Sequence, residues 1–213
     1  MLFDVPLYPI TDRELAGLGH AEQVRQLIAG GAKLIQLREK TLPAGKFFSE
    51  ARESLELSRE HGARIIINDR VDLALALGAH GVHLGQDDLP PAAARRLLGN
   101  RAIIGFSTHN LKQALEALKL PINYLAAGPI FPTASKSNPD SPIGLKGLRE
   151  IRAAIGAFPL VAIGGITAAN AADVIGAGAD AVAVISALIN PPKDITSRTG
   201  RLLSNLKEPR NPA

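Results

Sequence analysis

Polar and charged side chains follow three of the apolar runs in this chain, at the point where each run ends. The three segments read KLIQLREK at 33–40, RIIINDR at 64–70 and GVHLGQDD at 81–88. Cations and an amide end the first segment, whereas carboxylates end the other two. Such groups suit a phosphate and a metal ion. A pattern that repeats in this way indicates an enzyme site assembled at one end of a parallel barrel.

Gln36, Arg38 and Lys40 alternate with Leu37 and Glu39. In a strand, the three polar side chains therefore lie on one face. An arginine offers a planar fork of donors to phosphate oxygens, and a lysine offers a mobile point charge. With an amide beside them, the two cations favour a pyrophosphate group. A strand whose polar end is only solvated remains the alternative for these residues taken alone.

Acidic side chains end the next two runs, where Asn68 precedes Asp69 and Asp87 precedes Asp88. Carboxylate and amide oxygens suit a hard cation such as Mg²⁺, which keeps several waters and shares its shell with substrate phosphates. Helix N-capping is the alternative, because a helical pattern follows each pair. We expect one residue of each pair to be a cap.

Apolar runs and helical patterns alternate along the whole chain. Strands are expected at 5–10, 33–37, 65–67, 81–84, 102–105, 124–127, 160–163 and 181–185, and helices at 21–29, 44–60, 71–77, 91–98, 111–118, 145–155, 169–175 and 186–206. About eight such units predict an α/β fold, a (βα)8 TIM barrel that forms one catalytic domain over residues 1–206. Residues 207–213, with two prolines, are expected to be a flexible tail.

A doubly wound open sheet is the rival architecture, because it also alternates strands and helices. No GxGxxG segment follows an early strand, however. Glycines instead follow the seventh strand at Gly164 and Gly165, where TIM barrels commonly hold a phosphate. The glycine placement therefore favours the barrel.

Two further polar residues, Ser107 and His109, follow the fifth apolar run. Ser107 can donate to a phosphate oxygen or form a turn or cap before the next helix. His109 is a candidate general acid or base, but no carboxylate lies beside it in the sequence, so its role stays unassigned. His83 lies inside an apolar run and is expected to be a hydrogen-bonded barrel histidine.

The loops after the last three strands predict a second anion site. The loop GPIFPTASK carries hydroxyls and a cation, the AIGGI segment exposes backbone N–H groups, and AVISAL begins a helix. A helix start and exposed amides attract an anion. The candidate residues for this site are Thr133, Ser135, Gly165, Ile185 and Ser186, and Lys136 adds a cation on the same loop.

Composition narrows the class of partner. The chain has 213 residues, a net charge of +4 and no cysteine, and aromatic residues make up only 4%. A small positive charge favours anionic small molecules, whereas the few scattered aromatics argue against nucleic acid. No apolar run is long enough for a membrane span, and the lack of cysteine is consistent with the cytoplasm. Oligomeric state is left open, a homo-oligomer included.

The ordered set of motifs resembles the thiamine-phosphate synthase family. The strings LYPITD, IQLREK, IINDR, GVHLGQDD, IGFSTH, GPIFPTASK, VAIGGI and AVISAL carry the resemblance, between Leu7 and Leu188. It implies a (βα)8 barrel that joins 4-amino-2-methyl-5-pyrimidinylmethyl diphosphate, hereafter the pyrimidine diphosphate, to thiazole phosphate or its carboxylated precursor. The reaction it implies releases pyrophosphate.

The resemblance also implies a role for each site residue. Asp69 and Asp88 match the Mg²⁺ ligands, with Asp87 as a non-ligand. Arg38, Lys40, Lys136 and Ser107 are expected to be catalytic. The pyrimidine diphosphate is expected to bind Gln36, Arg38, Lys40, Asn68, Ser107 and Lys136, and the thiazole phosphate Thr133, Ser135, Gly165, Ile185 and Ser186. Two alternatives remain, a thiazole tautomerase that uses His109 and a non-catalytic sensor of thiamine phosphates.

Overall fold

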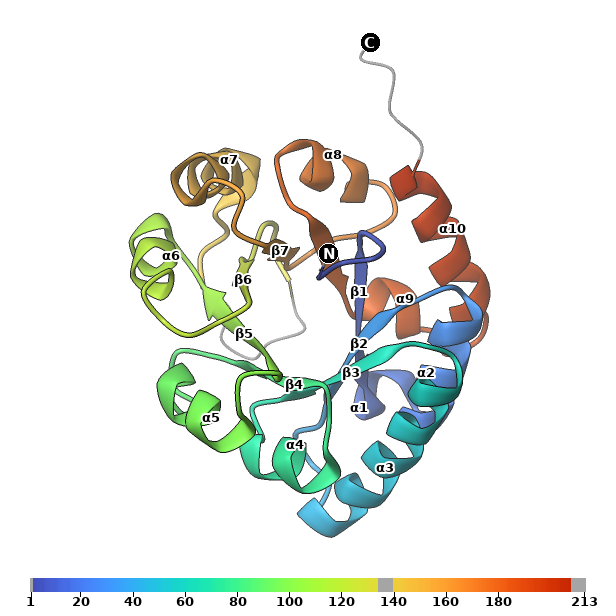
Figure 1. Cartoon of the computed structure of the whole chain (residues 1–213). Helices are drawn as coiled ribbons and strands as arrows, with labels where there is room; N and C mark the ends of the chain where they lie inside the picture. The colour runs from blue at the N-terminus through green and yellow to red at the C-terminus, as the bar shows by residue number, and fades with distance from the viewer. Residues whose placement is uncertain (1, 134–139, 208–213) are drawn as a thin grey trace.

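The computed structural model describes residues 2–133 and 140–207, and its strands close into a parallel barrel in sequential order (Figure 1). The strands are β1 (Leu7–Asp12), β2 (Leu34–Arg38), β3 (Arg64–Asn68), β4 (Gly81–Leu84), β5 (Ile103–Thr108), β6 (Tyr124–Ala127), β7 (Leu160–Ile163) and β8 (Ala181–Val184). The pairing of β1 with β8 closes the barrel. This confirms the predicted TIM barrel and excludes the open sheet.

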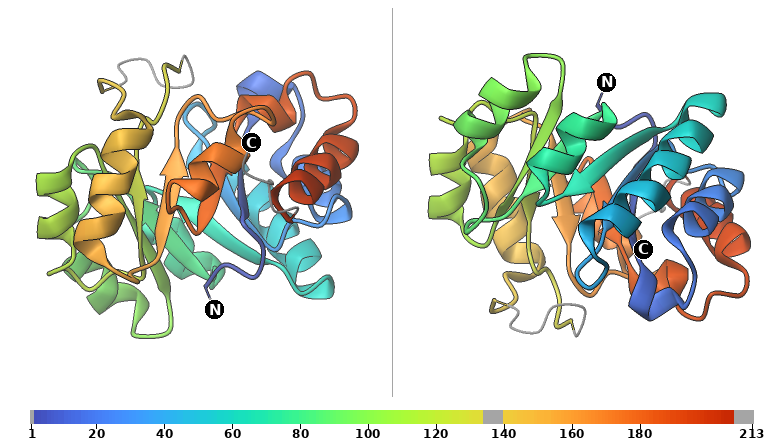
Figure 2. Two further views of the ribbon diagram at one scale, coloured as in Figure 1. Left: turned by 90° about the horizontal axis from the view of Figure 1, so that it is seen from above. Right: turned by 90° about the horizontal axis from the view of Figure 1, so that it is seen from below.

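Helices surround the barrel in each of the views of Figure 2. They are α1 (Arg13–Ala16), α2 (His20–Ala29), α3 (Ala44–Glu60), α4 (Val71–Leu77), α5 (Pro91–Leu98), α6 (Leu111–Ala117), α7 (Gly144–Ile155), α8 (Ala171–Gly176), α9 (Ser186–Ile189) and α10 (Ile195–Lys207). No helix in the described part of the chain has both the length and the apolar character that a membrane span requires.

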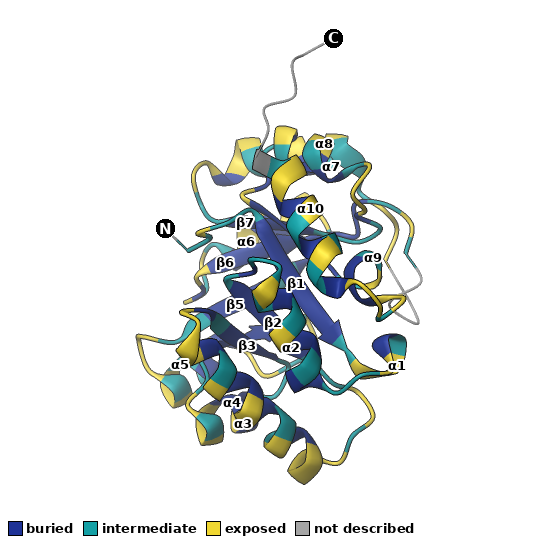
Figure 3. Cartoon of the chain, turned by 90° about the vertical axis from the view of Figure 1, so that its right-hand side faces the viewer, coloured by how far each residue is buried: buried dark blue, intermediate teal, exposed yellow. Residues whose placement is uncertain are grey.

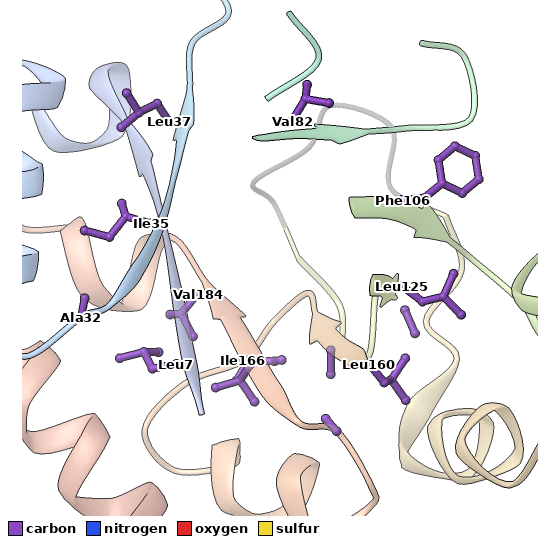
Figure 4. Packing of buried hydrophobic residues seen from close by; sticks show 14 of the residues in the cluster. Leu7, Ala32, Ile35, Leu37, Val82, Phe106, Leu125, Leu160, Ile166 and Val184 are labelled. Carbon is purple, nitrogen blue, oxygen red and sulfur yellow. The ribbon is translucent and has the colours of Figure 1, made fainter. Parts of the chain in front are cut away.

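Side chains of each strand alternate between two apolar layers. On β2, Ile35 and Leu37 pack between the barrel and the helices, whereas Leu34 belongs to the cluster inside the barrel. Figure 4 shows residues of the outer layer, such as Val82 and Leu125, pointing away from the barrel centre. Both layers are buried, as the dark strands of Figure 3 show. Gln36 and Arg38 share the inner face with Leu34, so the same alternation directs them to the inside.

Two arginines fasten the N-terminal ends of the strands. Arg95 of α5 donates to the side chain of Asn123, at 2.8 Å, and to carbonyls of the connecting loops. Arg152 of α7 repeats this arrangement two strands later with Asp180, at 2.7 Å. These contacts fix the barrel end opposite the predicted site, so they serve the stability of the fold rather than its chemistry.

The structure differs from the predicted elements at both ends of the chain. The single helix expected at 186–206 is wrong, because α9 and α10 are separate helices with Pro191 and Pro192 between them, and proline cannot continue a helix. The short helix α1 was not predicted; Asp12 caps it by accepting from the Leu15 N–H. The predicted tail begins at the last helical residue, Lys207, and otherwise lies outside the described residues.

Candidate active site

A cavity of about 990 Å³ lies at the C-terminal ends of the strands, and residues of all eight strands contribute to its lining. Ala126, Val161 and Ala183 form part of it, and their small side chains leave room above the barrel core. A concave site of this size suits a small-molecule ligand. This end of a TIM barrel is also where enzymes of this fold carry their active sites.

The cavity brings together every predicted site residue that the structure describes. Ser135 and Lys136 lie outside the described residues, so their placement stays a prediction. Those that line the cavity are Gln36, Arg38, Lys40, Asn68, Asp69, Asp88, Ser107, Thr133, Gly165, Ile185 and Ser186.

Two of the three predicted phosphate-binding cations, Arg38 and Lys40, lie in the described part of the chain, and both are held by carboxylates. Arg38 donates to Asp12 at 2.5 Å, and Asp12 is itself fixed as the cap of α1. Lys40 donates to Asp69 at 2.5 Å across the gap between β2 and β3. Arg38 is therefore pre-positioned at the cavity wall, whereas Lys40, with 52% of its side chain exposed, is held by a solvent-accessible ion pair.

The acidic pair Asp69 and Asp88 is held by turns rather than by helix caps. Asp69 has a φ of 59°, a left-handed conformation that asparagine and aspartate tolerate better than most residues. Asp88 accepts from the Gly85 N–H at 2.7 Å. The N-cap positions of α4 and α5 are Arg70 and Pro90, and neither makes a side-chain cap. The sequence pattern predicts a cap from one residue of each consecutive pair, Asn68 with Asp69 and Asp87 with Asp88. That expectation is wrong.

The electrostatics of the acidic pair fit a hard cation. Burial raises the pKa of Asp88, and the nearby Asp69 carboxylate raises it further, against the lowering effect of the Gly85 N–H. Two neighbouring carboxylates repel each other when both are charged, and a divalent cation bound between them offsets that repulsion. Within the described residues, no cluster of three or more His, Cys, Asp or Glu could hold a metal. A Mg²⁺ ion here would therefore need waters and ligand oxygens, as is usual for it.

Ser107 contacts a histidine at the cavity floor. Its Oγ lies 2.9 Å from His83 Nε2, and His83 Nδ1 lies 2.9 Å from the Tyr124 hydroxyl. Burial lowers the pKa of His83 to about 4, so its ring is neutral at physiological pH. His83 is thus the hydrogen-bonded barrel histidine that was predicted. Ser107 is not the cap of α6, because Asn110 accepts from the Gln113 N–H there.

His109 acquires a carboxylate neighbour that sequence spacing could not reveal. Its Nδ1 lies 2.7 Å from the Gly128 carbonyl and 3.4 Å from Asp140 Oδ2. Because a carbonyl can only accept, Nδ1 carries the proton in that hydrogen bond. Both His109 and Asp140 line the cavity. Tyr8 and Gln86 also line it and were not predicted as site residues.

The second predicted anion site lies in tight backbone turns. Gly164 and Gly165 have φ values of 101° and 63°. A Cβ on Gly165 would come within 2.6 Å of the Pro132 carbonyl oxygen, so only glycine fits beneath that loop. Ser186 begins α9, which has only four residues. A helix this short adds little dipole, so backbone and hydroxyl donors would have to provide most of the anion binding.

A TIM barrel with cations, paired carboxylates and hydroxyl donors around one C-terminal cavity is typical of an enzyme that acts on small molecules. The chain belongs to the thiamine monophosphate synthase family, whose family model matches residues 7–188. Members of this family serve thiamine biosynthesis, and the chain is a transferase.

Similar proteins agree with this assignment. The chain is 48% identical over 202 residues to a protein of Chloroflexus aurantiacus named thiamine-phosphate synthase, covering 94% of this chain and 92% of the relative. A solved structure, the thiamine phosphate pyrophosphorylase from Pyrococcus furiosus, superposes with a TM-score of 0.86 at 40% identity, covering 95% and 96% of the two chains. A thiamine phosphate pyrophosphorylase from Bacteroides thetaiotaomicron shares the fold at a TM-score of 0.69 and 17% identity, covering 95% and 99%.

Proposed function

We propose that this chain joins the pyrimidine diphosphate to thiazole phosphate, or its carboxylated precursor, to form thiamine phosphate and pyrophosphate. The observation that carries the proposal is one cavity that combines the cations Arg38 and Lys40 with the carboxylates Asp69 and Asp88. Such a set suits a reaction in which a diphosphate departs and negative charge grows on it. A cytoplasmic reaction between small molecules, without nucleic acid or membrane, is part of the proposal.

The pyrimidine diphosphate is proposed to lie along the β2, β3 and β5 side of the cavity. Arg38 and Lys40 would bind the diphosphate oxygens, with Asn68 adding an amide donor and Ser107 a hydroxyl. Gln36 lies deeper in the cavity, only 2% exposed, and would hydrogen-bond the pyrimidine. Lys136, which follows β6 in the sequence, would complete the cationic set.

Asp69 and Asp88 would hold Mg²⁺, which supplies charge neutralisation and a template for the leaving diphosphate when it is bound. The fit rests on their oxygen donors, their proximity and the raised pKa of Asp88. Asp87, the neighbouring residue, is exposed and is assigned no ligand role.

Dissociative substitution is the chemistry that these side chains favour. The bond between the pyrimidinylmethyl carbon and the diphosphate oxygen breaks, and its electron pair leaves with the diphosphate. Arg38, Lys40 and Lys136 stabilise the charge that grows there. The thiazole nitrogen then donates its lone pair to the carbon. No protein nucleophile takes part, and the enzyme contributes by positioning the two substrates and excluding water.

The thiazole phosphate is proposed to bind on the opposite side, above β7 and β8. Gly165, Ile185 and Ser186 would supply backbone and hydroxyl donors, and Thr133 and Ser135 would add hydroxyls from the loop after β6. A separate subsite for each anion keeps the two negative substrates apart until the nitrogen and carbon meet.

The test is to incubate the protein with both substrates and Mg²⁺ and to follow products by mass spectrometry. Thiamine phosphate and pyrophosphate formed in equal amounts support the proposal. Interconversion of thiazole isomers without pyrophosphate would instead identify a tautomerase, in which His109 would move the proton. Tight binding of thiamine phosphate without any turnover would identify a sensor.

A further inference from the structure

A chain of hydrogen bonds crosses the barrel beneath the cavity and links two of the proposed substrate contacts. Gln36 Nε2 lies 3.0 Å from the Tyr8 hydroxyl, which lies 2.9 Å from the Tyr124 hydroxyl. Tyr124 lies 2.9 Å from His83 Nδ1, and His83 Nε2 lies 2.9 Å from Ser107 Oγ. These five residues, here called the relay, come from five different strands. The proposed function uses only its two ends.

The middle of the relay is almost completely buried at the floor of the cavity. Tyr8 and Tyr124 are 1% and 0% exposed, and His83 is 8% exposed. The His83 and Tyr124 rings stack with centroids 5.5 Å apart, and Phe3 also packs edge-on against Tyr124. Burial raises the pKa of both tyrosine hydroxyls, so each keeps its proton. A buried polar hydrogen needs a partner, and here the partners are the other relay members.

Gly105 makes room for the contact at the centre of the relay. A Cβ at this position would lie 2.0 Å from Tyr124 Cζ and 2.5 Å from His83 Nδ1. No side chain is compatible with the hydrogen bond between Tyr124 and His83. The glycine on β5 is therefore explained by space rather than by backbone conformation.

At any one time, all four hydrogen bonds of the relay must donate in the same direction along it. Four hydrogen bonds need four hydrogens, but Tyr8, Tyr124 and neutral His83 supply only one each. The fourth must come from one end, either the Gln36 amide or the Ser107 hydroxyl. If Gln36 donates, each interior hydrogen must point onward, and His83 donates from Nε2 to Ser107. If Ser107 donates, every bond reverses and Gln36 must accept.

We propose that Tyr8, Tyr124 and His83 are positioning residues that set the donor and acceptor polarity of both substrate contacts. Gln36 donates through Nε2, so His83 is the Nε2–H tautomer and Ser107 accepts from it. The Ser107 proton is then left for a substrate acceptor, and the Gln36 carbonyl for a substrate donor.

This inference deepens the proposed function and rests on it for the identity of the substrate. An aminopyrimidine carries an amine donor beside a ring-nitrogen acceptor, which complements the carbonyl and second N–H of the Gln36 amide. An analogue with oxygen in place of the amine would place two acceptors against each other. This repulsion could be removed only if every hydrogen bond of the relay reversed its direction. The relay therefore selects for the amino group more strongly than an isolated glutamine would.

The direction of the relay can be read from ¹⁵N NMR of the histidine rings in the ligand-free protein, at about pH 8 where ordinary histidines are neutral. Protonated and unprotonated ring nitrogens differ widely in chemical shift, and loss of one set of signals in His83→Gln assigns His83. The wild-type protein is expected to show the Nε2–H tautomer. Gln36→Glu removes the donor and adds an acceptor, so the tautomer is expected to switch to Nδ1–H.

Tyr8→Phe provides the matched control, because it cuts the relay while preserving the ring. In the double variant Gln36→Glu with Tyr8→Phe, the Tyr124 hydroxyl has His83 as its sole relay acceptor. We expect the Nε2–H tautomer to return. A direct electrostatic effect of the new carboxylate would not be cancelled by this loss of one hydroxyl.

Three outcomes overturn the inference: an Nδ1–H tautomer in the wild-type protein, no switch in folded Gln36→Glu, or a switch that survives Tyr8→Phe. If Gln36→Glu does not fold, the wild-type tautomer still decides. Because the protein carries no substrate in these measurements, their failure is distinct from failure of the proposed reaction, which is judged by product formation.

Discussion

Lys40 Nζ lies 2.5 Å from Asp69 Oδ2, so a proposed phosphate-binding cation is paired with a proposed metal-binding carboxylate. Lys40 is half exposed, and an accessible ion pair of this kind contributes little stability. The pair can therefore exchange partners when ligands arrive. In the ligand-free protein, Lys40 and a divalent cation are competitors for the same carboxylate.

Removal of Lys40 is expected to affect metal binding and turnover in opposite directions. Lys40→Met should tighten Mg²⁺ binding to the ligand-free protein about threefold to tenfold, up to ~1.4 kcal/mol, because the competing cation is gone. It should also slow pyrophosphate release, because the leaving group loses a positive charge. Calorimetry with Mg²⁺ and steady-state kinetics measure the two effects. Weaker Mg²⁺ binding in this variant would show that Lys40 does not compete with Mg²⁺ for Asp69.

Asp69→Asn and Asp88→Asn should each lower turnover by about 10²-fold or more, ~3 kcal/mol, because an amide is a poorer ligand for a hard cation. The Mg²⁺ concentration for half-maximal rate should rise in both. Asp87→Asn is the matched control, one residue from Asp88 and exposed in the same cavity. Unchanged Mg²⁺ dependence in both variants would refute the metal assignment.

Arg38→Lys should be harmful although it keeps the charge. A lysine cannot contact Asp12 and a phosphate with the planar fork that the guanidinium offers. We expect kcat/KM for the pyrimidine diphosphate to fall at least ~10-fold, about 1.4 kcal/mol. Arg25→Lys on the surface of α2, which pairs with Glu22, is the control and should be neutral. Full activity of Arg38→Lys would show that Arg38 does not bind the diphosphate and is only a solvated residue at the end of β2.

The lowered pKa of Glu39 makes the free energy of unfolding depend on pH. Burial alone would raise its pKa, but the Thr41 and Leu42 N–H groups and His20 lower the pKa to about 2. Because this folded-state pKa lies below the ordinary value of 4.5, the stabilisation is present above pH 4.5 and is lost as pH falls toward 2. The side chain is 4% exposed, so the contribution is up to about 3 kcal/mol.

Denaturant unfolding of Glu39→Gln between pH 7 and pH 2 tests this dependence. The variant should be less stable at neutral pH and should lose less free energy of unfolding through the acid range. Glu60→Gln, at the exposed end of α3, should follow the wild-type curve. Parallel pH curves for Glu39→Gln and the wild-type protein would contradict the lowered pKa of Glu39.

The two substrate subsites can be separated by paired variants. Ser186→Ala should raise KM for thiazole phosphate several-fold and spare the pyrimidine diphosphate, whereas Lys136→Ala should do the reverse. Gly165→Val is a poorer choice, because its Cβ would also push against Pro132 and Phe131 and displace the neighbouring loop. Titration of each substrate against both variants measures the separation. Equal losses for both substrates in both variants would indicate a single shared anion pocket.

Much of this fold follows from local patterns in the sequence. Continuous apolar strands alternating with helical periodicity define a barrel, and α3 has the predicted bounds. The last helix was mispredicted because apolar spacing continues across Pro191 and Pro192, which in fact end α9. The short helix α1 was missed because four residues carry too little periodicity to detect.

The site was predictable in its residue types but not in its internal contacts. Strand ends of a parallel barrel converge, so Gln36 and Ser107 could be placed in one cavity from their positions alone. Their connection through Tyr8, Tyr124 and His83 depends on packing across the barrel, which no local pattern records. The same holds for Asp140, which reaches His109 from a loop thirty-one residues further along the chain.

The most direct test of the account is pyrophosphate release from the pyrimidine diphosphate, with and without thiazole phosphate and with and without Mg²⁺. We expect rapid release only when both thiazole phosphate and Mg²⁺ are present, with one thiamine phosphate formed for each pyrophosphate. Equal rates of release with and without Mg²⁺, or no release under any of the four conditions, would contradict a metal-assisted transfer in this cavity.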